Sequence, residues 1–463
     1  MQSVEMDSPR GFRRGLLIAV IVGALWRLSV LVFDKWNQQL LLNDSIYYSV
    51  QARQVAEGRW FREIFVDQPG AEHGPLTSLL LAAVSWVDDP LPWQRLLTVC
   101  FGIGTIVAIG LLGRRLGGPR VGVTAAAIAA VYPNLWMNDG LVMSESLSML
   151  LVTAVLLAAH RAMSTPGWRV VAVTGVLAGL ATLARSELAL LVPGLAAMLW
   201  FVGRPPGCAA RQSDGAMSGT AMLDAATLRS TAPGTAALRP RPVSWRERLI
   251  RPAVVVGAAV LVVSPWAAFN LSRFERPVTL TTNDGTTLLG SYCDGSFGGP
   301  NMGGWSLFCV VDDPAYDVAE EPSVRSARQR TLAVSYARAH LTRLPVVVAA
   351  RIGRSLDLYG LDSLVAQDVG EERYRWASWA GIVSWWALGV AAVMGLRRID
   401  SRTRWLLLLP CAAVVVTTIV FYGGHRIRSS MEPTVVIAAA VMIVRLLARL
   451  QPQADVSIEH IEG

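Results

Sequence analysis

The sequence has 463 residues, of which 53% are hydrophobic and only 16% are charged. This composition is too apolar for an ordinary soluble domain, in which about 25% of the residues are charged. The formal net charge of +8 does not indicate a nucleic-acid partner, because the basic residues cluster between apolar blocks, where membrane topology explains them. We therefore predict a protein that lies in a lipid bilayer and binds no nucleic acid.

Apolar blocks follow one another along the chain at lengths that suit membrane-spanning helices, which need roughly 20 residues. They predict about ten spans, at residues 15–33, 93–113, 120–135, 141–159, 168–184, 187–203, 252–269, 376–396, 404–422 and 433–449. The segment 76–87 is apolar but too short to span, so it predicts a juxtamembrane helix. The expected fold class is an all-α polytopic membrane protein.

The distribution of arginine orients these spans. With the N-terminus inside, the inside connections are mostly short and Arg-rich, as the positive-inside rule requires, so both termini are expected in the cytoplasm of a plasma membrane. The segment 204–251 is rich in small residues, Pro and Arg and predicts a disordered cytoplasmic linker. The loop 270–375 has Gly-rich turns, aromatic residues and balanced charges, which indicates a small ordered external subdomain. The other predicted regions are the cytoplasmic ends 1–14 and 450–463, the N-terminal membrane core 15–203 with its external loop 34–92, the span 252–269 and the C-terminal spans 376–449.

The first external loop contains the most informative motif, Asp44-Ser45-Ile46-Tyr47-Tyr48. A carboxylate at the membrane boundary, such as Asp44, could accept a proton as a general base or help to hold a divalent cation. The alternative is a helix cap, because an amphipathic stretch follows Asp44. The two roles are compatible, since a capping residue also lies at an exposed helix end.

Positive charge recurs on the predicted outer face, against the positive-inside bias. Arg185 and Glu187 lie in a short turn between two spans, and His425, Arg426 and Arg428 lie in the last external loop. A guanidinium matches a phosphate in both geometry and charge, which favours phosphate binding. The alternatives are an Arg185–Glu187 ion pair in the turn and arginines that snorkel to lipid head groups in the last loop.

The large external loop contains Cys293 and Cys309, and a disulfide can persist on the outer face of a membrane. Closing a loop of about 15 residues is worth roughly 3 kcal/mol in the chain-entropy model. The spacing of the cysteines fits no metal site, so we predict a disulfide between them.

The order and placement of these motifs resemble those of GT-C-type membrane glycosyltransferases, a group that includes protein O-mannosyltransferases and the aminoarabinose transferases of lipid A. The first-loop motif resembles theirs with Ser45 in place of the usual Glu, and His73-Gly74-Pro75-Leu76 resembles a later family segment with Gly74 in place of a Pro. The loop 270–375 resembles that of actinobacterial members. The resemblance implies a catalytic base at Asp44, donor-phosphate ligands at Arg185, Arg426 and Arg428, and further substrate contacts at Tyr47, Tyr48, His73, Glu145 and His425.

The resemblance also implies a reaction. A sugar would pass from a polyprenyl-phosphate donor to a glycan, lipid or protein acceptor of the cell envelope, by one inverting displacement on the outer face. No cofactor is required by this scheme, and a divalent cation is left open. One alternative is a transporter or flippase of lipid-linked saccharides, which would carry ionisable residues near the midplane. Arg27 is the main charge well inside a span and the polar residues concentrate in the outside loops, which favours surface chemistry over transport. A second alternative is a ligase or polymerase that shares the fold.

Overall fold

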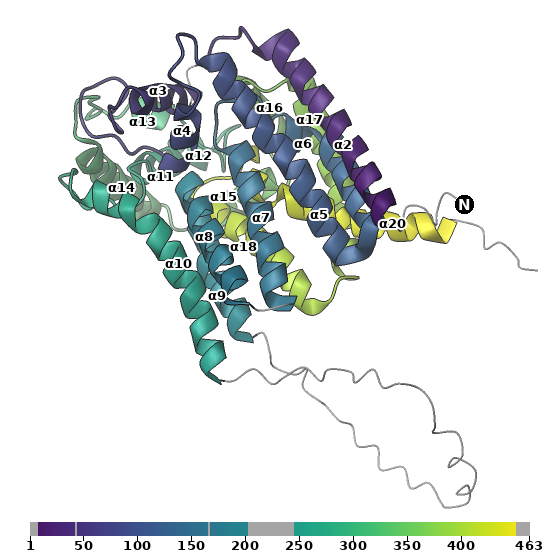
Figure 1. The fold of residues 1–463 in the computed structure, drawn as a ribbon. Helices are drawn as coiled ribbons and strands as arrows, with labels where there is room; N and C mark the ends of the chain where they lie inside the picture. The colour runs from purple at the N-terminus through teal and green to yellow at the C-terminus, as the bar shows by residue number, and fades with distance from the viewer. Residues whose placement is uncertain (1–7, 42–43, 165–166, 202–244, 451–463) are drawn as a thin grey trace, which may run out of the picture.

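The computed structural model describes residues 8–41, 44–164, 167–201 and 245–450, and this part of the chain is helical, with no β-strand in it (Figure 1). Seven helical segments are long and apolar enough to cross a membrane, judged by length and composition: Pro9–Lys35, Leu91–Val131, Glu145–Ser164, Trp245–Leu271, Arg375–Leu396, Ser401–Val420 and His425–Leu450. Two shorter apolar helices, Trp168–Ala184 and Ser186–Phe201, lie among them. The chain is therefore an all-α multi-pass membrane protein, as its composition predicts.

The longest of these segments, α5 (Leu91–Val131), contains two helical arms. The chain reverses at Gly118, whose φ of 86° is in the left-handed region that glycine tolerates, and Pro119 begins the second arm. The arms pack so closely that a Cβ on Gly113 would lie 3.2 Å from the Cα of Gly122. The predicted spans 93–113 and 120–135 are these two arms, so each of the ten predicted spans corresponds to a helix or a helical arm.

Several boundaries differ from those expected. The first helix, α2 (Pro9–Val30), begins before residue 15 and continues as a π-helical turn, η1 (Leu31–Lys35). The predicted linker 204–251 is wrong at its end, because α10 (Trp245–Leu271) already includes the residues from Trp245 onward. The rest of that predicted linker and most of the predicted cytoplasmic tail, residues 451–463, lie outside the described residues.

The core of the bundle forms around α20 (Glu432–Leu450), in which every residue from Glu432 to Met442 is buried. This helix packs against α5 and α17 (Arg375–Leu396), while α7 (Glu145–Ser164) joins α5 to α8 (Trp168–Ala184). Many of the buried positions on α5 and α20 are alanine, which lets helices approach closely in a membrane. Leucine, isoleucine and valine side chains of α2 and α17 are exposed on the outside, as lipid-facing surfaces require.

Short helices outside the bundle form the functional end of the molecule. In the first loop these are α3 (Asp44–Ala56) and α4 (Pro75–Ala82), and in the loop 270–375 they are α11 (Asp284–Ser291), α12 (Asp294–Phe297), α13 (Phe308–Val311), α14 (Pro322–Ala339), α15 (Leu344–Ser355) and α16 (Leu361–Gly370). Figure 1 shows α3, α4 and α11 to α14 gathered at one corner of the bundle (upper left). Cys293 and Cys309 form a disulfide, with 6.3 Å between their Cα atoms.

The charge well inside the first span is neutralised. The guanidinium of Arg27 lies 2.6 Å from the carboxylate of Asp139, and both side chains are buried. The hydroxyl of Ser146 also donates to Asp139, and Arg27 donates to the carbonyl oxygens of Ala129 and Ala130. An intramembrane arginine with this many partners is anchored, so it holds the loop after α5 against the first helix.

Candidate active site

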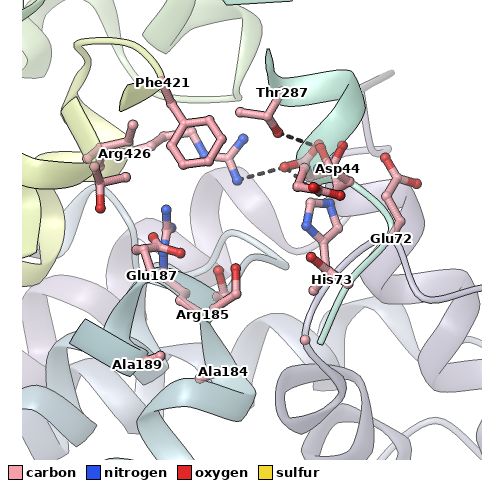
Figure 2. Close-up of a pocket in the computed structure, with 18 of the residues that line it drawn as sticks. Asp44, Glu72, His73, Ala184, Arg185, Glu187, Ala189, Thr287, Phe421 and Arg426 are labelled. Atoms are coloured by element: carbon pink, nitrogen blue, oxygen red, sulfur yellow. Dashed lines mark hydrogen bonds and ion pairs between the residues drawn. The ribbon is translucent and has the colours of Figure 1, made fainter. Parts of the chain in front are cut away.

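A cavity of about 440 Å³ opens where several separate segments meet (Figure 2). Its walls come from the start of α3 with residues 72–74, from the turn 184–190 after α8, from α11, and from residues 416–427, which join α18 (Ser401–Val420) to α19 (His425–Arg428). The segments are far apart in the sequence, and the site exists only because the helices bring them together.

Asp44 lies at this cavity, in the first turn of α3, where the helix dipole favours a carboxylate. Its Oδ2 is 2.7 Å from Nη2 of Arg426 and 3.4 Å from Nε2 of His73, and its side chain is 27% exposed. Burial by itself raises the pKa of Asp44, but the charges of Arg426 and His73 outweigh it and hold the pKa well below its usual range. Asp44 is therefore an ionised carboxylate whose negative charge is balanced by the positive charge of Arg426.

His73 is fixed by the two tyrosines of the first-loop motif. Its ring stacks on Tyr48 with 5.0 Å between centroids and 20° between planes, and it meets Tyr47 edge-on, also at 5.0 Å. Burial lowers the pKa of His73, but the carboxylate of Asp44 outweighs this effect and raises it. Tyr48 lines the cavity, whereas Tyr47 is buried behind it. The motif thus orients His73 toward Asp44.

Gly74 explains one departure from the family pattern. A Cβ at this position would lie 2.3 Å from the carbonyl oxygen of Leu183, near the end of α8. Proline carries a Cβ, so it would clash here. The missing side chain lets α4 begin directly against α8, which places His73 next to the turn that contains Arg185.

Glu145 joins the two cavity arginines. Its Oε1 is 2.9 Å from Nη1 of Arg185 and 2.8 Å from Nε of Arg426, and its side chain is buried. Arg185 also binds Glu187 at 2.5 Å, so the ion pair weighed as an alternative is present. Burial lowers the pKa of Arg185, and the two glutamates outweigh it and raise it. Figure 2 shows Arg185 and Arg426 on one side of the cavity, facing Asp44 and His73.

Arg426 is the point where this network converges. Besides Asp44 and Glu145, its guanidinium reaches Glu371, with Nη1 3.6 Å from Oε1. Glu371 follows α16, and nothing in its sequence neighbourhood points to the site. The three carboxylates stand at the start of α3, at the start of α7 and just after α16, so Arg426 ties these three parts of the chain to α19.

The other two candidate site residues of the last loop, His425 and Arg428, do not line the cavity. His425 lies between Asp357 and Asp368, at 2.7 and 2.8 Å. Arg428 has no exposed surface and binds Asp357 at 2.5 Å and Glu432 at 2.8 Å. The structure thus does not support the predicted roles of His425 in substrate contact and of Arg428 in phosphate binding. Both side chains face the core, and they fix the short helix that presents Arg426.

A second cavity, of about 710 Å³, shares Asp44 and Arg426 with the first. Its lining includes Glu72 and Glu63, which the sequence analysis did not single out, although Glu72 directly precedes the noted segment at His73. Burial and the nearby carboxylate of Glu72 raise the pKa of Glu63 to about 7, and burial raises the pKa of Glu72. The Asp44–Arg426 pair therefore stands where two cavities meet.

The donor set at Asp44 does not fit a divalent cation. Within the described residues, no three His, Cys, Asp or Glu side chains are grouped as metal ligands. The cation partners of Asp44 and Glu145 are already arginines, and hard cations need several oxygen ligands around them. We derive no step through a metal ion.

Comparison with known proteins gives a family match over part of the chain. Residues 72–211 match the family described as dolichyl-phosphate-mannose-protein mannosyltransferase. Among curated proteins, none matches the sequence.

Solved structures of the oligosaccharyltransferase of Archaeoglobus fulgidus share the fold. The apo form has a TM-score of 0.53 at 13% identity over 94% of this chain, and the complex with zinc and sulfate has a TM-score of 0.52 at 13% identity over 93%. The complex of this archaeal oligosaccharyltransferase, AglB, with an inhibitory peptide and a dolichol-phosphate has a TM-score of 0.51 at 13% identity over 94%. The chain spans about half the length of these proteins, 51%, 49% and 50% respectively.

The family match over residues 72–211 and the shared fold are consistent with the class that the motifs predicted, a GT-C-type membrane glycosyltransferase. Within this class, the specific family match is the mannosyltransferase family over residues 72–211. The resemblance to actinobacterial members stays a prediction.

Proposed function

We propose that this chain is an integral-membrane glycosyltransferase that moves a sugar from a polyprenyl-phosphate donor to an acceptor hydroxyl at the outer face, with Asp44 as general base. The observation that carries the proposal is that Asp44 and Arg426 form a 2.7 Å ion pair and line both cavities. A displacement at one carbon needs a base for the incoming hydroxyl and a cation for the leaving phosphate near the same point.

The first cavity suits the lipid-linked donor. Apolar side chains at the ends of membrane helices, Leu190, Val416 and Val420, line it together with Arg185 and Arg426. An isoprenoid chain would contact the apolar wall, and the phosphate would meet the two guanidiniums. The match to a family named for dolichyl-phosphate-mannose supports a donor of this kind.

Donor binding would also activate the base. In the free protein Asp44 is a weak base, because Arg426 and His73 stabilise its charged form. A phosphate that binds Arg426 competes with Asp44 for the same guanidinium, so the pKa of Asp44 rises toward its usual range. The base would thus become effective only when the donor is in place.

The step itself balances in atoms and charge. The acceptor oxygen forms a bond to the anomeric carbon as the bond from that carbon to the phosphate oxygen breaks. The bonding electron pair stays on the phosphate, where Arg185 and Arg426 stabilise it, and Asp44 takes the hydroxyl proton. One displacement of this type inverts the anomeric configuration, and preorganised cations are expected to supply the largest stabilisation.

The surroundings of Arg27 favour a transferase over the transporter alternative. Arg27, the charge well inside a span, has Asp139 and two backbone carbonyls as partners and is held against α5. Transport sites instead present ionisable groups to a pathway near the midplane.

The direct test uses the full-length protein in nanodiscs with radiolabelled polyprenyl-phosphate sugars and a total cell-envelope acceptor fraction. We expect polyprenyl phosphate to be released in equal amount to the sugar transferred. In proteoliposomes, passage of labelled donor across the bilayer without release of phosphate would contradict the proposal and support a flippase.

A further inference from the structure

We propose that the second cavity binds an amphiphilic acceptor, whose alkyl chain lies at the cavity mouth while its hydroxyl reaches Asp44. This inference rests on the proposed function and names the acceptor class of this chain; the description of the family matched over residues 72–211 names a protein acceptor instead, and the fold assigns none. It is carried by a pairing within one cavity, which is lined both by the charged Asp44–Arg426 pair and by a group of exposed, large apolar side chains.

The rim consists of large apolar side chains that are exposed yet line the cavity. Phe65 is 71% exposed and Phe308 is 72% exposed. The apolar rim, as we call this surface, comprises Phe65, Leu307, Phe308, Val311, Tyr316 and Val318. Single exposed apolar residues are ordinary, but a contiguous group around a cavity marks a binding surface.

The rim is held in place by covalent and helical structure. Phe308 and Val311 lie on α13, whose Cys309 is joined by the disulfide to Cys293 at the start of α12. This bond keeps α13 against α11, so its apolar side chains stay at the cavity although little packs over them. Asp44, the first residue of α3, lines the same cavity as Phe308.

Uncharged polar groups line the second cavity as well. Thr286 and Gln329 line the same cavity, and the Thr286 hydroxyl donates to Oε1 of Gln329 at 2.8 Å. The Nε2 of Gln329 is buried and has no hydrogen-bond partner, and the residue itself is fully buried. A buried donor without a partner is costly, so a ligand oxygen that accepts from it would be favoured. The cavity therefore matches a molecule with an oxygen-rich head and an apolar chain.

A lipid-like acceptor fits this cavity better than an extended peptide. Peptides that bind in extended form commonly add to the edge of a sheet, where main-chain hydrogen bonds supply affinity. The described part of the chain offers no strand, only an isolated bridge between Arg62 and Pro69. The rim offers apolar side chains instead, which an alkyl chain can contact without leaving polar groups unpaired.

The test is a competition assay with the full-length protein in nanodiscs. Transfer of labelled sugar to the total cell-envelope fraction is inhibited with octyl β-D-glucopyranoside or with methyl β-D-glucopyranoside, both below the micelle concentration of the octyl compound. The two probes carry the same hydroxyls and differ only in their chain. Each buried methylene contributes ~0.8 kcal/mol, a factor of about four in binding. We expect the octyl compound to inhibit at a concentration at least about tenfold lower than the methyl compound.

A variant at the rim locates the effect. Phe308→Ser should remove most of this preference, while Phe308→Leu should retain it and Leu332→Ser, an exposed position on α14 away from the cavity, should leave it unchanged. All three variants are expected to keep wild-type inhibition by the methyl compound, which shows that they are folded. If Phe308→Ser is no longer inhibited by the methyl compound, it is not folded, and Phe308→Leu becomes the deciding variant. Full retention of the preference for the octyl compound in folded Phe308→Leu supports the alkyl site. Loss of that preference supports a rim that recognises a specific shape instead.

Three results would overturn the inference. The first is equal inhibition by the two glucosides, and the second is an octyl preference that Phe308→Ser leaves intact in a folded protein. The third is stronger inhibition by an apolar serine-containing peptide with the same dependence on Phe308, which would assign the cavity to a protein acceptor. In each case label still reaches the envelope fraction, so the proposed function stands; absence of any transfer would instead remove the proposed function.

Discussion

The bridging carboxylate of Glu145 offers a quantitative test of the site. It is buried and lies 2.9 Å from Arg185 and 2.8 Å from Arg426. Glu145→Gln keeps the size of the side chain but leaves two buried guanidiniums without the charge between them. Breaking a buried ion pair on one side typically costs about 3–5 kcal/mol. We expect a loss of this size in the free energy of unfolding, measured in mixed SDS micelles.

A double-mutant cycle shows whether the loss comes from the bridge. Glu145→Gln combined with Arg185→Gln removes both partners, so the double variant should be more stable than the sum of the single losses by about 1–3 kcal/mol. The exposed pair Arg53–Glu57 is the matched control, since its side chains are 54% and 43% exposed, and removing its charges should cost at most about 1 kcal/mol. Additive losses at Glu145 and Arg185 would refute the bridge.

Three further changes test separate parts of the account. Burial raises the folded-state pKa of Glu63 from its ordinary value of 4.5 to about 7, so between these values the folded protein binds a proton that the unfolded chain has released. The free energy of unfolding therefore falls as the pH rises through this range. The unfolding midpoint of Glu63→Gln should not show this fall, and a pH profile identical to that of the wild type would contradict the shift. Gly74→Ala should cost about 1–3 kcal/mol by overpacking, whereas Gly257→Ala, with open space around its Cα, should cost nothing. Arg428→Gln should lower the yield of folded protein but leave the KM for donor unchanged in the folded fraction; a raised KM would return Arg428 to phosphate binding.

The membrane fold could be predicted from the sequence because span length and arginine bias are local signals. Each apolar block is read without knowledge of its neighbours. These two local signals do not predict the structure where the path of the backbone depends on a single residue. At Gly118 the left-handed backbone turns one continuous helical segment back on itself, and the start of α10 at Trp245 lies within a stretch whose composition indicates disorder.

The site could be predicted only in part, because sequence spacing does not tell which way a side chain points. Asp44, Arg185 and Arg426 meet at one cavity, as their shared outer location suggested. His425 and Arg428 are three residues apart, so they share the face of α19 that meets Asp357, whereas Arg426 lies on another face and reaches Asp44. The contact between Arg426 and Glu371 joins distant segments and leaves no local pattern.

The central claim is that Asp44 is the base of a sugar transfer from a polyprenyl-phosphate donor. The most direct measurement compares initial rates of label transfer for wild type, Asp44→Asn and the control Asp67→Asn, whose carboxylate lies in the same loop and is 91% exposed. The account predicts that Asp44→Asn transfers about 10²- to 10⁴-fold more slowly, the usual contribution of a general base, while Asp67→Asn matches wild type. Equal rates for Asp44→Asn and wild type would contradict it.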